Sequence, residues 1–129
     1  MKFLSDYMME KKSYQRLFIH HMNKAASKLK LYDTRFANVH GLMNDKAYST
    51  SHNISLLTCI AMKNNTFAEL VGKKEFSCKV YNRTFSQYRN VSWKNTNRLL
   101  NTEGFVGVKT GVTPSAGPCL ASMFRTNSS

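Results

Sequence analysis

The sequence of 129 residues is poor in acidic side chains, in cysteine and in long apolar runs. Seven Asp and Glu stand against nineteen Lys and Arg, which leaves a net charge of +12. Such an excess raises the question of nucleic-acid binding. The basic residues are scattered as single residues and short pairs, however, and no zinc-finger spacing, ribonucleoprotein motif or basic-region heptad accompanies them. We therefore predict a solvated basic surface and no specific nucleic-acid partner.

The three cysteines, Cys59, Cys78 and Cys119, are too few and too far apart to form a disulfide framework or a CxxC pair. Each lies in an apolar pattern, so we expect three buried thiols. The adjacent His20 and His21 would point about 100° apart on a helix and cannot present two metal ligands on one face. We predict neither a metal site nor a cofactor.

The length allows one domain with a modest core. No apolar run is long enough to span a membrane, so we expect no transmembrane segment. The charged residues Asp6, Glu10, Lys11 and Lys12 interrupt the apolar core that an N-terminal signal peptide would need. We therefore expect no export signal in this chain, and the sequence leaves its compartment open.

Apolar spacing predicts helices first and strands afterwards. Apolar residues recur at three- and four-residue steps over residues 13–29, which is typical of an amphipathic helix. A second helix is expected to begin after Thr50, and Thr66-x-x-Glu69 matches a capping box for a short third helix. Alternating apolar residues predict a strand over residues 76–80, followed by a polar stretch. Two later apolar runs predict a pair of strands, the first containing Lys109 and the second covering residues 119–124.

Lys109-Thr110-Gly111 is the most informative motif, because Lys-Thr-Gly on a strand is one of three motifs that build the site of active-serine penicillin-binding enzymes. Alone, the tripeptide would also suit an ordinary strand flanked by a turn. Five other segments accompany the motif in a recognisable order. The whole set is Phe18-x-x-x-Met22-Asn23-x-x-Ala26, Thr34-x-Phe36-x-Asn38-Val39-His40-Gly41-Leu42, Tyr48-Ser49-Thr50, Trp93-x-Asn95-Thr96-Asn97-x-Leu99-Leu100, Gly107-Val108-Lys109-Thr110-Gly111-x-Thr113 and Ala116-Gly117-x-Cys119-Leu120.

This set resembles the serine-type D-alanyl-D-alanine carboxypeptidases, the low-molecular-mass penicillin-binding proteins of peptidase family S11, from about residue 13 to residue 123. The resemblance implies an α+β chain with a partial β-lactamase/transpeptidase-like fold, in which a helical subdomain accompanies a β-hairpin that carries Lys-Thr-Gly. Residues 1–129 would form a single partial catalytic domain, with a polar tail at 125–129. The implied ligand is a peptidoglycan stem peptide or a β-lactam, and family members act outside the cytoplasmic membrane.

The resemblance also implies roles for individual residues. Lys109 would attract the terminal carboxylate of the substrate, and Thr110 would hydrogen-bond to it. Gly111 would let the substrate backbone lie against the strand edge, because no Cβ blocks the approach. Thr113 completes the substrate-binding set. His40-Gly41 belongs to the family's loop near the mouth of the site, where we expect His40 to order the loop by hydrogen bonds rather than to perform chemistry.

The two remaining family motifs, Ser-x-x-Lys and Ser-x-Asn, are matched only by Ser27-Lys28-Leu29-Lys30 and Ser51-His52-Asn53. Ser27 falls at the end of its helix, where the helix dipole disfavours a developing alkoxide, and Lys30 shares a solvated basic face. Ser51 begins a segment that caps a helix in the family, and Asn53 occupies the position of the capping Asp. We predict that neither Ser27 with Lys30 nor Ser51 with Asn53 is catalytic.

We therefore expect a chain truncated at both ends relative to the family, which alone does not catalyse the family's hydrolysis. One hypothesis is a hydrolase fragment, from a gene model or a pseudogene, whose missing half is encoded upstream. A second is a non-enzymatic module that binds peptidoglycan peptides or an acidic partner through Lys109 and the basic surface. The third is a nucleic-acid binder driven by charge, which predicts a steep fall in affinity with salt.

Overall fold

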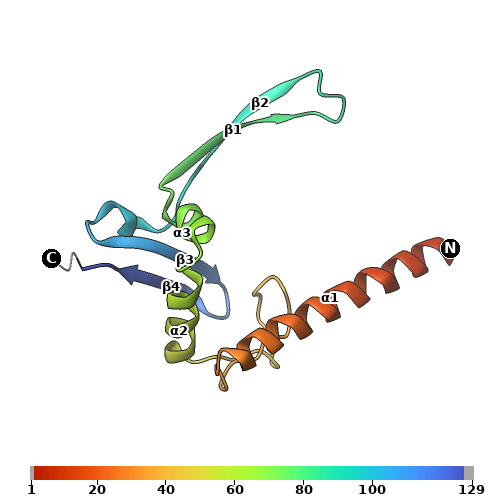
Figure 1. Cartoon of the computed structure of the whole chain (residues 1–129). Helices are drawn as coiled ribbons and strands as arrows, with labels where there is room; N and C mark the ends of the chain where they lie inside the picture. Colours follow the sequence, from red (N-terminus) through yellow and green to blue (C-terminus); the bar gives the residue numbers. More distant parts are fainter. Residues whose placement is uncertain (1, 127–129) are drawn as a thin grey trace. The chain divides into compact units, whose positions relative to one another are not determined.

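A computed structural model describes residues 2–126, and their side chains from residue 13 onward. Three helices come first: α1 (Lys2–Lys28), α2 (Ser51–Ala61) and α3 (Asn65–Gly72). They are followed by strands β1 (Glu75–Tyr81), β2 (Tyr88–Lys94), β3 (Phe105–Thr113) and β4 (Gly117–Phe124), with the short 3-10 helix η1 (Arg98–Asn101) between β2 and β3 (Figure 1). The chain is α+β with its helices before its strands, as expected.

The chain divides into two compact units. The first comprises residues 1–57 and 113–117, and the second comprises residues 58–112 and 118–129. The boundary falls inside α2, after Leu57. The interpretation of residues 1–129 as a single partial catalytic domain stays a prediction.

Helix α1 ends in a Schellman motif. The Leu31 N–H donates to the Ala26 carbonyl at 2.9 Å and the Lys30 N–H to the Ser27 carbonyl at 3.0 Å, which are the two bonds of that motif. Lys30 takes the left-handed conformation that the motif requires, with φ 59°. Ala26 and Leu31 are both buried beside the turn. The helix thus ends where the apolar period predicted, but it begins well before residue 13, because residues 2–12 contain no proline or glycine to stop it.

Asn23 fixes the chain that follows α1. Its amide nitrogen donates to the Phe36 carbonyl at 2.8 Å, and its amide oxygen accepts from the Phe36 N–H at 2.8 Å. Arg35 and Tyr48 form an isolated antiparallel bridge just beyond this clamp. The irregular segment between α1 and α2 is therefore held by a side-chain amide and by one isolated backbone bridge.

Asn64, and not Thr66, caps α3. The Asn64 side chain accepts a hydrogen bond from the Phe67 N–H at 3.0 Å. Glu69 pairs with Lys73 at 3.3 Å, one helical turn further on. The capping box predicted from Thr66 and Glu69 is wrong, because asparagine is at least as good an N-cap as threonine and stands two residues earlier.

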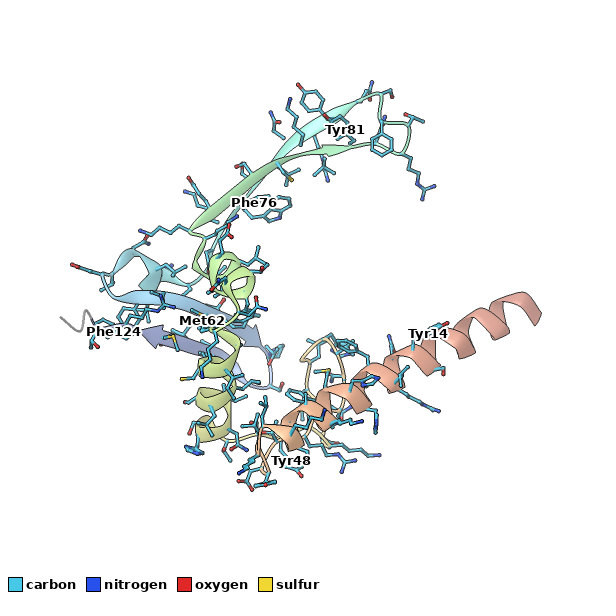
Figure 2. The ribbon with its side chains drawn as sticks, in the orientation of Figure 1. Tyr14, Tyr48, Met62, Phe76, Tyr81 and Phe124 are labelled. Atoms are coloured by element: carbon cyan, nitrogen blue, oxygen red, sulfur yellow. The ribbon has the colours of Figure 1, made fainter. Side chains whose placement is uncertain are left out.

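Strands β1 and β2 form an antiparallel pair, with Glu75 opposite Lys94 and Tyr81 opposite Tyr88. Phe76 and Tyr81 lie near the two ends of β1 (Figure 2). Strand β1 was predicted from its alternation. The residues after β1 were expected to form a polar stretch, which is wrong for residues 88–94, because they form β2. The strand pattern is hidden because Arg, Asn, Ser and Lys stand among the apolar residues of β2.

Strands β3 and β4 form a second two-stranded sheet, which confirms the pair predicted around Lys109. Only three residues connect them, so the pairing is antiparallel. Phe105 and Phe124 meet edge to face with ring centroids 5.1 Å apart, and the Arg125 N–H donates to the Gly104 carbonyl at 2.8 Å. The far end of the hairpin is therefore held by an aromatic pair and a backbone bond.

Few apolar side chains are buried among the described residues: Ala26 and Leu31 in the first unit, and Met62, Leu100 and Val108 in the second. Many large apolar side chains stay exposed on α1, on both hairpins and in the loops. Cys59 and Cys119 are exposed and Cys78 is half-buried. The expectation of buried thiols is wrong, because no described element covers the faces of α2 and β4 that carry the two exposed cysteines.

Arg125 and Thr126 follow β4 outside any helix or strand, and the rest of the polar tail expected at 125–129 lies outside the described residues. None of the described helices combines the length and the apolar character needed to cross a membrane.

Candidate functional site

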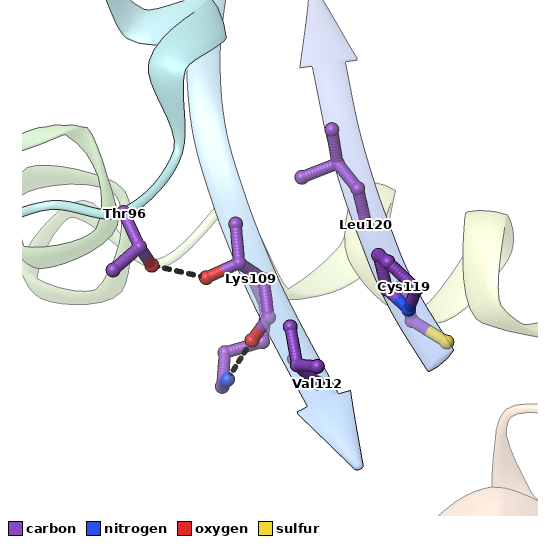
Figure 3. A pocket seen from close by; sticks show the side chains of 8 residues that line it. Thr96, Lys109, Val112, Cys119 and Leu120 are labelled. Carbon is purple, nitrogen blue, oxygen red and sulfur yellow. Dashed lines mark hydrogen bonds between the residues drawn. The ribbon is translucent and has the colours of Figure 1, made fainter. Parts of the chain in front are cut away.

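A hollow of about 540 Å³ lies along the β3–β4 hairpin (Figure 3). It falls entirely within the second compact unit. Residues 109–112 contribute from β3 and residues 118–120 from β4, and one residue comes from the segment before η1. The lining residues are Thr96, Lys109, Thr110, Gly111, Val112, Pro118, Cys119 and Leu120.

Lys109 is the one charged residue that lines this hollow. Its side chain is exposed, and its ammonium donates a hydrogen bond to the carbonyl of Thr110. Lys109 forms no salt bridge with any residue that the structure describes. An exposed ammonium without a carboxylate partner can attract an anion to this hollow.

Thr110 presents a hydroxyl next to that charge. Its Oγ1 lies 2.5 Å from the Oγ1 of Thr96, and either hydroxyl can be the donor (Figure 3). When Thr96 donates, the proton of Thr110 is left to donate to a ligand. The pair can therefore act as a two-hydroxyl relay that ends at the hollow. Thr96 was not predicted as a site residue, although it stands between Asn95 and Asn97.

Two side-chain amides hold Thr96 in place. Asn97 is only 3% exposed, and its Nδ2 donates to the Gly107 carbonyl at 2.9 Å. Asn95 donates to the carbonyl of Lys73 at 2.9 Å, just after α3. Gly107 belongs to β3 and Lys73 directly follows α3. The segment 95–97 is therefore hydrogen-bonded both to β3 and to the end of α3. The side-chain amides of Asn95 and Asn97 thus bind backbone carbonyls on both sides of Thr96.

Gly111 is a glycine that the fold itself does not require. A Cβ built on it meets no atom within 4 Å, and its φ lies outside the left-handed region. Gly104 is the opposite case, because its φ is +85° and an added Cβ would lie 2.3 Å from the Phe124 ring. The space in front of Gly111 is open, so another backbone can approach β3 there.

The other members of the predicted site lie elsewhere. Thr113 is at the end of β3 in the first unit and does not line the hollow. Its Oγ1 accepts from the Ala116 N–H at 3.1 Å and lies 3.3 Å from the Ser115 hydroxyl, so it orders the turn. His40 and Gly41 also belong to the first unit; His40 Nδ1 accepts from the Leu42 N–H at 3.2 Å. The roles of Thr113, His40 and Gly41 towards a substrate stay predictions.

The Ser-x-x-Lys match forms the Schellman motif that ends α1. Ser27 contributes its carbonyl to that motif, and Lys30 supplies the left-handed residue. Both side chains are exposed, and no hydrogen bond joins the Ser27 hydroxyl to the Lys30 ammonium in the part of the chain that the structure describes. The motif accounts for this spacing without any catalytic role.

The Ser-x-Asn match forms the start of α2. Thr50 caps the helix, since its Oγ1 accepts from the Asn53 N–H at 3.1 Å. The Asn53 side chain is 4% exposed and donates to Thr34 Oγ1 at 3.0 Å, and Thr34 lies 2.9 Å from the Ser49 hydroxyl. Ser51 is exposed at the first position of the helix. The amide of Asn53 is thus committed to a structural network.

No group of three or more His, Cys, Asp or Glu within residues 2–126 could hold a metal ion.

Comparisons with known proteins agree on one family. The profile of the peptidase family S11, described as D-alanyl-D-alanine carboxypeptidase, matches residues 12–129. A D-alanyl-D-alanine carboxypeptidase of Streptomyces sp. (strain K15) is 41% identical over 104 residues, which cover 80% of this chain and 36% of that protein. The D-alanyl-D-alanine carboxypeptidase DacD of Escherichia coli (strain K12) is 33% identical over 105 residues, covering 80% of this chain and 25% of that protein.

The folds agree as well. The crystal structure of the Streptomyces K15 DD-transpeptidase superposes with a TM-score of 0.78 at 38% identity, over 85% of this chain and 42% of that one. The chain spans about a third or less of the length of the curated relatives that it matches. Profile, sequence identity and superposition give the same answer: the chain belongs to the D-alanyl-D-alanine carboxypeptidase family, peptidase family S11.

Proposed function

We propose that the β3–β4 hollow holds the C-terminal carboxylate of a peptidoglycan peptide that ends in D-Ala-D-Ala, as the substrate-holding part of a carboxypeptidase site. The observation that carries the proposal is the adjacency of Lys109 and Thr110 in a hollow that contains no carboxylate. An ammonium and a hydroxyl together offer a carboxylate one charged and one neutral hydrogen bond.

The remaining lining residues fit a peptide ligand. When the Thr96 hydroxyl donates to Thr110, the Thr110 hydroxyl can donate to the carboxylate. Gly111 leaves its strand edge open to the ligand backbone. Val112 and Leu120, both exposed, offer apolar surface to the methyl groups of the two alanines.

Hydrolysis through an acyl-serine needs a serine within hydrogen-bond reach of a base, about 2.6–3.2 Å. Within the part of the chain that the structure describes, no hydrogen bond joins the hydroxyl of Ser27 or of Ser51 to such a base. We infer that this chain alone does not cleave the peptide, and that an upstream-encoded half supplies the nucleophile, its lysine and the second motif. In the assembled site the chain's contribution is to fix the peptide by its carboxylate, so that the bond between the two D-alanines faces the serine.

Titration of the isotopically labelled chain with a diacetyl-Lys-D-Ala-D-Ala peptide, followed by NMR, tests the binding step. We expect shift changes confined to residues near Lys109 and Gly111, and a loss of affinity of roughly tenfold in Lys109→Ala, which removes a charged hydrogen bond. Lys46→Ala, which removes another exposed lysine, in the first unit, is the matched control. The same peptide with a C-terminal amide should bind as weakly as the variant does.

Equal affinity of Lys109→Ala and the unaltered chain would refute the proposal. Equal affinity for any acidic peptide, regardless of its D-alanines, would favour the alternative of a non-enzymatic module for acidic partners, which the charge of +12 permits. Fluorescent penicillin tests the inferred inactivity. We expect no covalent label, and a label that disappears in Ser27→Ala or in Ser51→Ala would contradict it.

A further inference from the structure

The connection between β1 and β2 gathers three aromatic rings at one end of the hairpin. The ring centroids of Tyr81 and Phe85 are 6.1 Å apart, and those of Tyr81 and Tyr88 are 5.6 Å apart. Phe85 is 78% exposed, and the two tyrosines are about half exposed. Tyr81 therefore lies against both other rings, and Phe85 leaves most of its surface uncovered.

The Asn82 side chain builds the loop that presents Phe85. Its oxygen accepts from the Thr84 hydroxyl and from the Ser86 N–H, both at 3.1 Å, and its nitrogen donates to the Ser86 hydroxyl at 3.1 Å. Phe85 has φ 55°, a left-handed conformation that costs a bulky residue about 1–2 kcal/mol. A strained backbone conformation persists only where the surrounding structure fixes it, and such residues are concentrated at functional positions. An ordered loop thus holds a strained, bare phenylalanine outward.

Cations accompany these rings, one in the connecting loop and two on the strands behind it. Lys79, Arg83 and Arg89 are the charged residues between positions 79 and 89, and no carboxylate lies among them. The Lys79 ammonium lies 4.4 Å from the centroid of the Tyr88 ring. Lys79 stands two residues back from Tyr81 and Arg89 one residue back from Tyr88, about 3–7 Å along the hairpin.

We propose that this tip cluster (Tyr81, Phe85 and Tyr88 with Lys79, Arg83 and Arg89) docks on the surface of an anionic lipid bilayer. Phe85 has no polar atom and would enter the acyl boundary, and the tyrosines would lie at the level of the headgroups, where a ring with a polar end is favoured. The three cations would meet lipid phosphates, at roughly a fivefold gain in partitioning each.

The order of the groups favours a bilayer over a nucleic acid. Proteins that bind single strands distribute stacking rings along a charged groove. Here the rings contact one another at the hairpin end, with Lys79 and Arg89 on the strands behind them and Arg83 in the same loop as Phe85. The proposal does not depend on the ligand of the β3–β4 hollow.

Co-sedimentation of the full chain with vesicles tests the proposal, using phosphatidylcholine alone and phosphatidylcholine with 30% phosphatidylglycerol as probes. We expect binding to the anionic vesicles that weakens with salt. Arg83→Gln/Arg89→Gln should lower the partition coefficient roughly 30-fold, from two lost cations. Phe85→Ser should lower it roughly tenfold, from the lost burial of the ring.

Matched variants separate the tip from the general basicity of the chain. Lys24→Gln/Lys28→Gln removes the same charge from exposed positions of α1, and Tyr32→Ser removes an aromatic ring that is 74% exposed in the first unit. Both controls should bind at least fivefold better than the corresponding tip variants. Equal losses in control and tip variants would overturn the proposal, as would equal binding to both kinds of vesicle. Tip-dependent binding to a single-stranded oligonucleotide that exceeds binding to anionic vesicles would also overturn it.

Discussion

Asn97→Ala should destabilise the chain strongly, because this buried amide joins η1 to the strand that carries Lys109. The substitution deletes the bond to the Gly107 carbonyl and the capping bond from the Leu99 N–H, which measure 2.9 and 3.2 Å. Each neutral bond contributes about 1 kcal/mol, and leaving the Gly107 carbonyl buried without a partner adds about 1–2 kcal/mol. The loss in the free energy of unfolding is then about 3 kcal/mol. In urea, with a slope of about 1.5 kcal/mol per molar, the unfolding midpoint falls by about 2 M.

Urea unfolding followed by circular dichroism measures this shift, with Asn101→Ala as the control. Asn101 ends η1, is exposed and makes no side-chain hydrogen bond among the described residues, so its replacement should change the free energy by less than about 0.5 kcal/mol. A loss below about 1 kcal/mol in Asn97→Ala, with an unchanged slope, would refute the reasoning. It would mean that water or a shift of β3 satisfies the Gly107 carbonyl.

Three further predictions concern the site and the end of α1. Gly111→Ala should leave the free energy of unfolding within about 0.5 kcal/mol while it weakens binding of the D-Ala-D-Ala peptide roughly tenfold; Gly104→Ala should instead cost about 1–3 kcal/mol in urea unfolding. Thr96→Val should weaken peptide binding about fivefold in the NMR titration at an unchanged melting temperature, and Thr96→Ser should restore it. Lys30→Gly should raise the melting temperature by about 4 °C, because glycine adopts φ 59° without strain, and an unchanged temperature would contradict the Schellman assignment.

The spacing of apolar residues predicted those helices and strands in which that spacing is regular. The end of α1, the start of α2, β1 and the β3–β4 pair were all found this way. Strand β2 was not, since its faces carry both charged and aromatic residues and a hairpin without a covering layer imposes no strict alternation. The cap of α3 was missed because two competing N-cap residues, Asn64 and Thr66, stand two positions apart, and propensity alone does not rank them.

The candidate site also contains residues that the sequence predicts and one that it does not. Lys109, Thr110 and Gly111 could be found from the sequence because they are consecutive on one strand, so their spacing is independent of the fold. Thr96 could not be found from the sequence, because its contact with Thr110 depends on the hydrogen bonds by which Asn95 and Asn97 hold the segment between the end of α3 and β3. A tertiary hydrogen bond across fourteen residues leaves no local pattern to read.

Gly104, just before β3, and Gly111, which lines the hollow, are glycines for different reasons. At Gly104 the fold requires glycine, because φ is +85° and the Phe124 ring fills the place of a Cβ. At Gly111 neither backbone angle nor packing within the described chain excludes a side chain. A strand interior loses about 0.5–1 kcal/mol by carrying glycine instead of alanine. Nothing within the described chain offsets that cost. In the proposed function the backbone of the peptide occupies the open space in front of Gly111, and Gly111→Ala tests this directly, because it should weaken peptide binding at an unchanged free energy of unfolding.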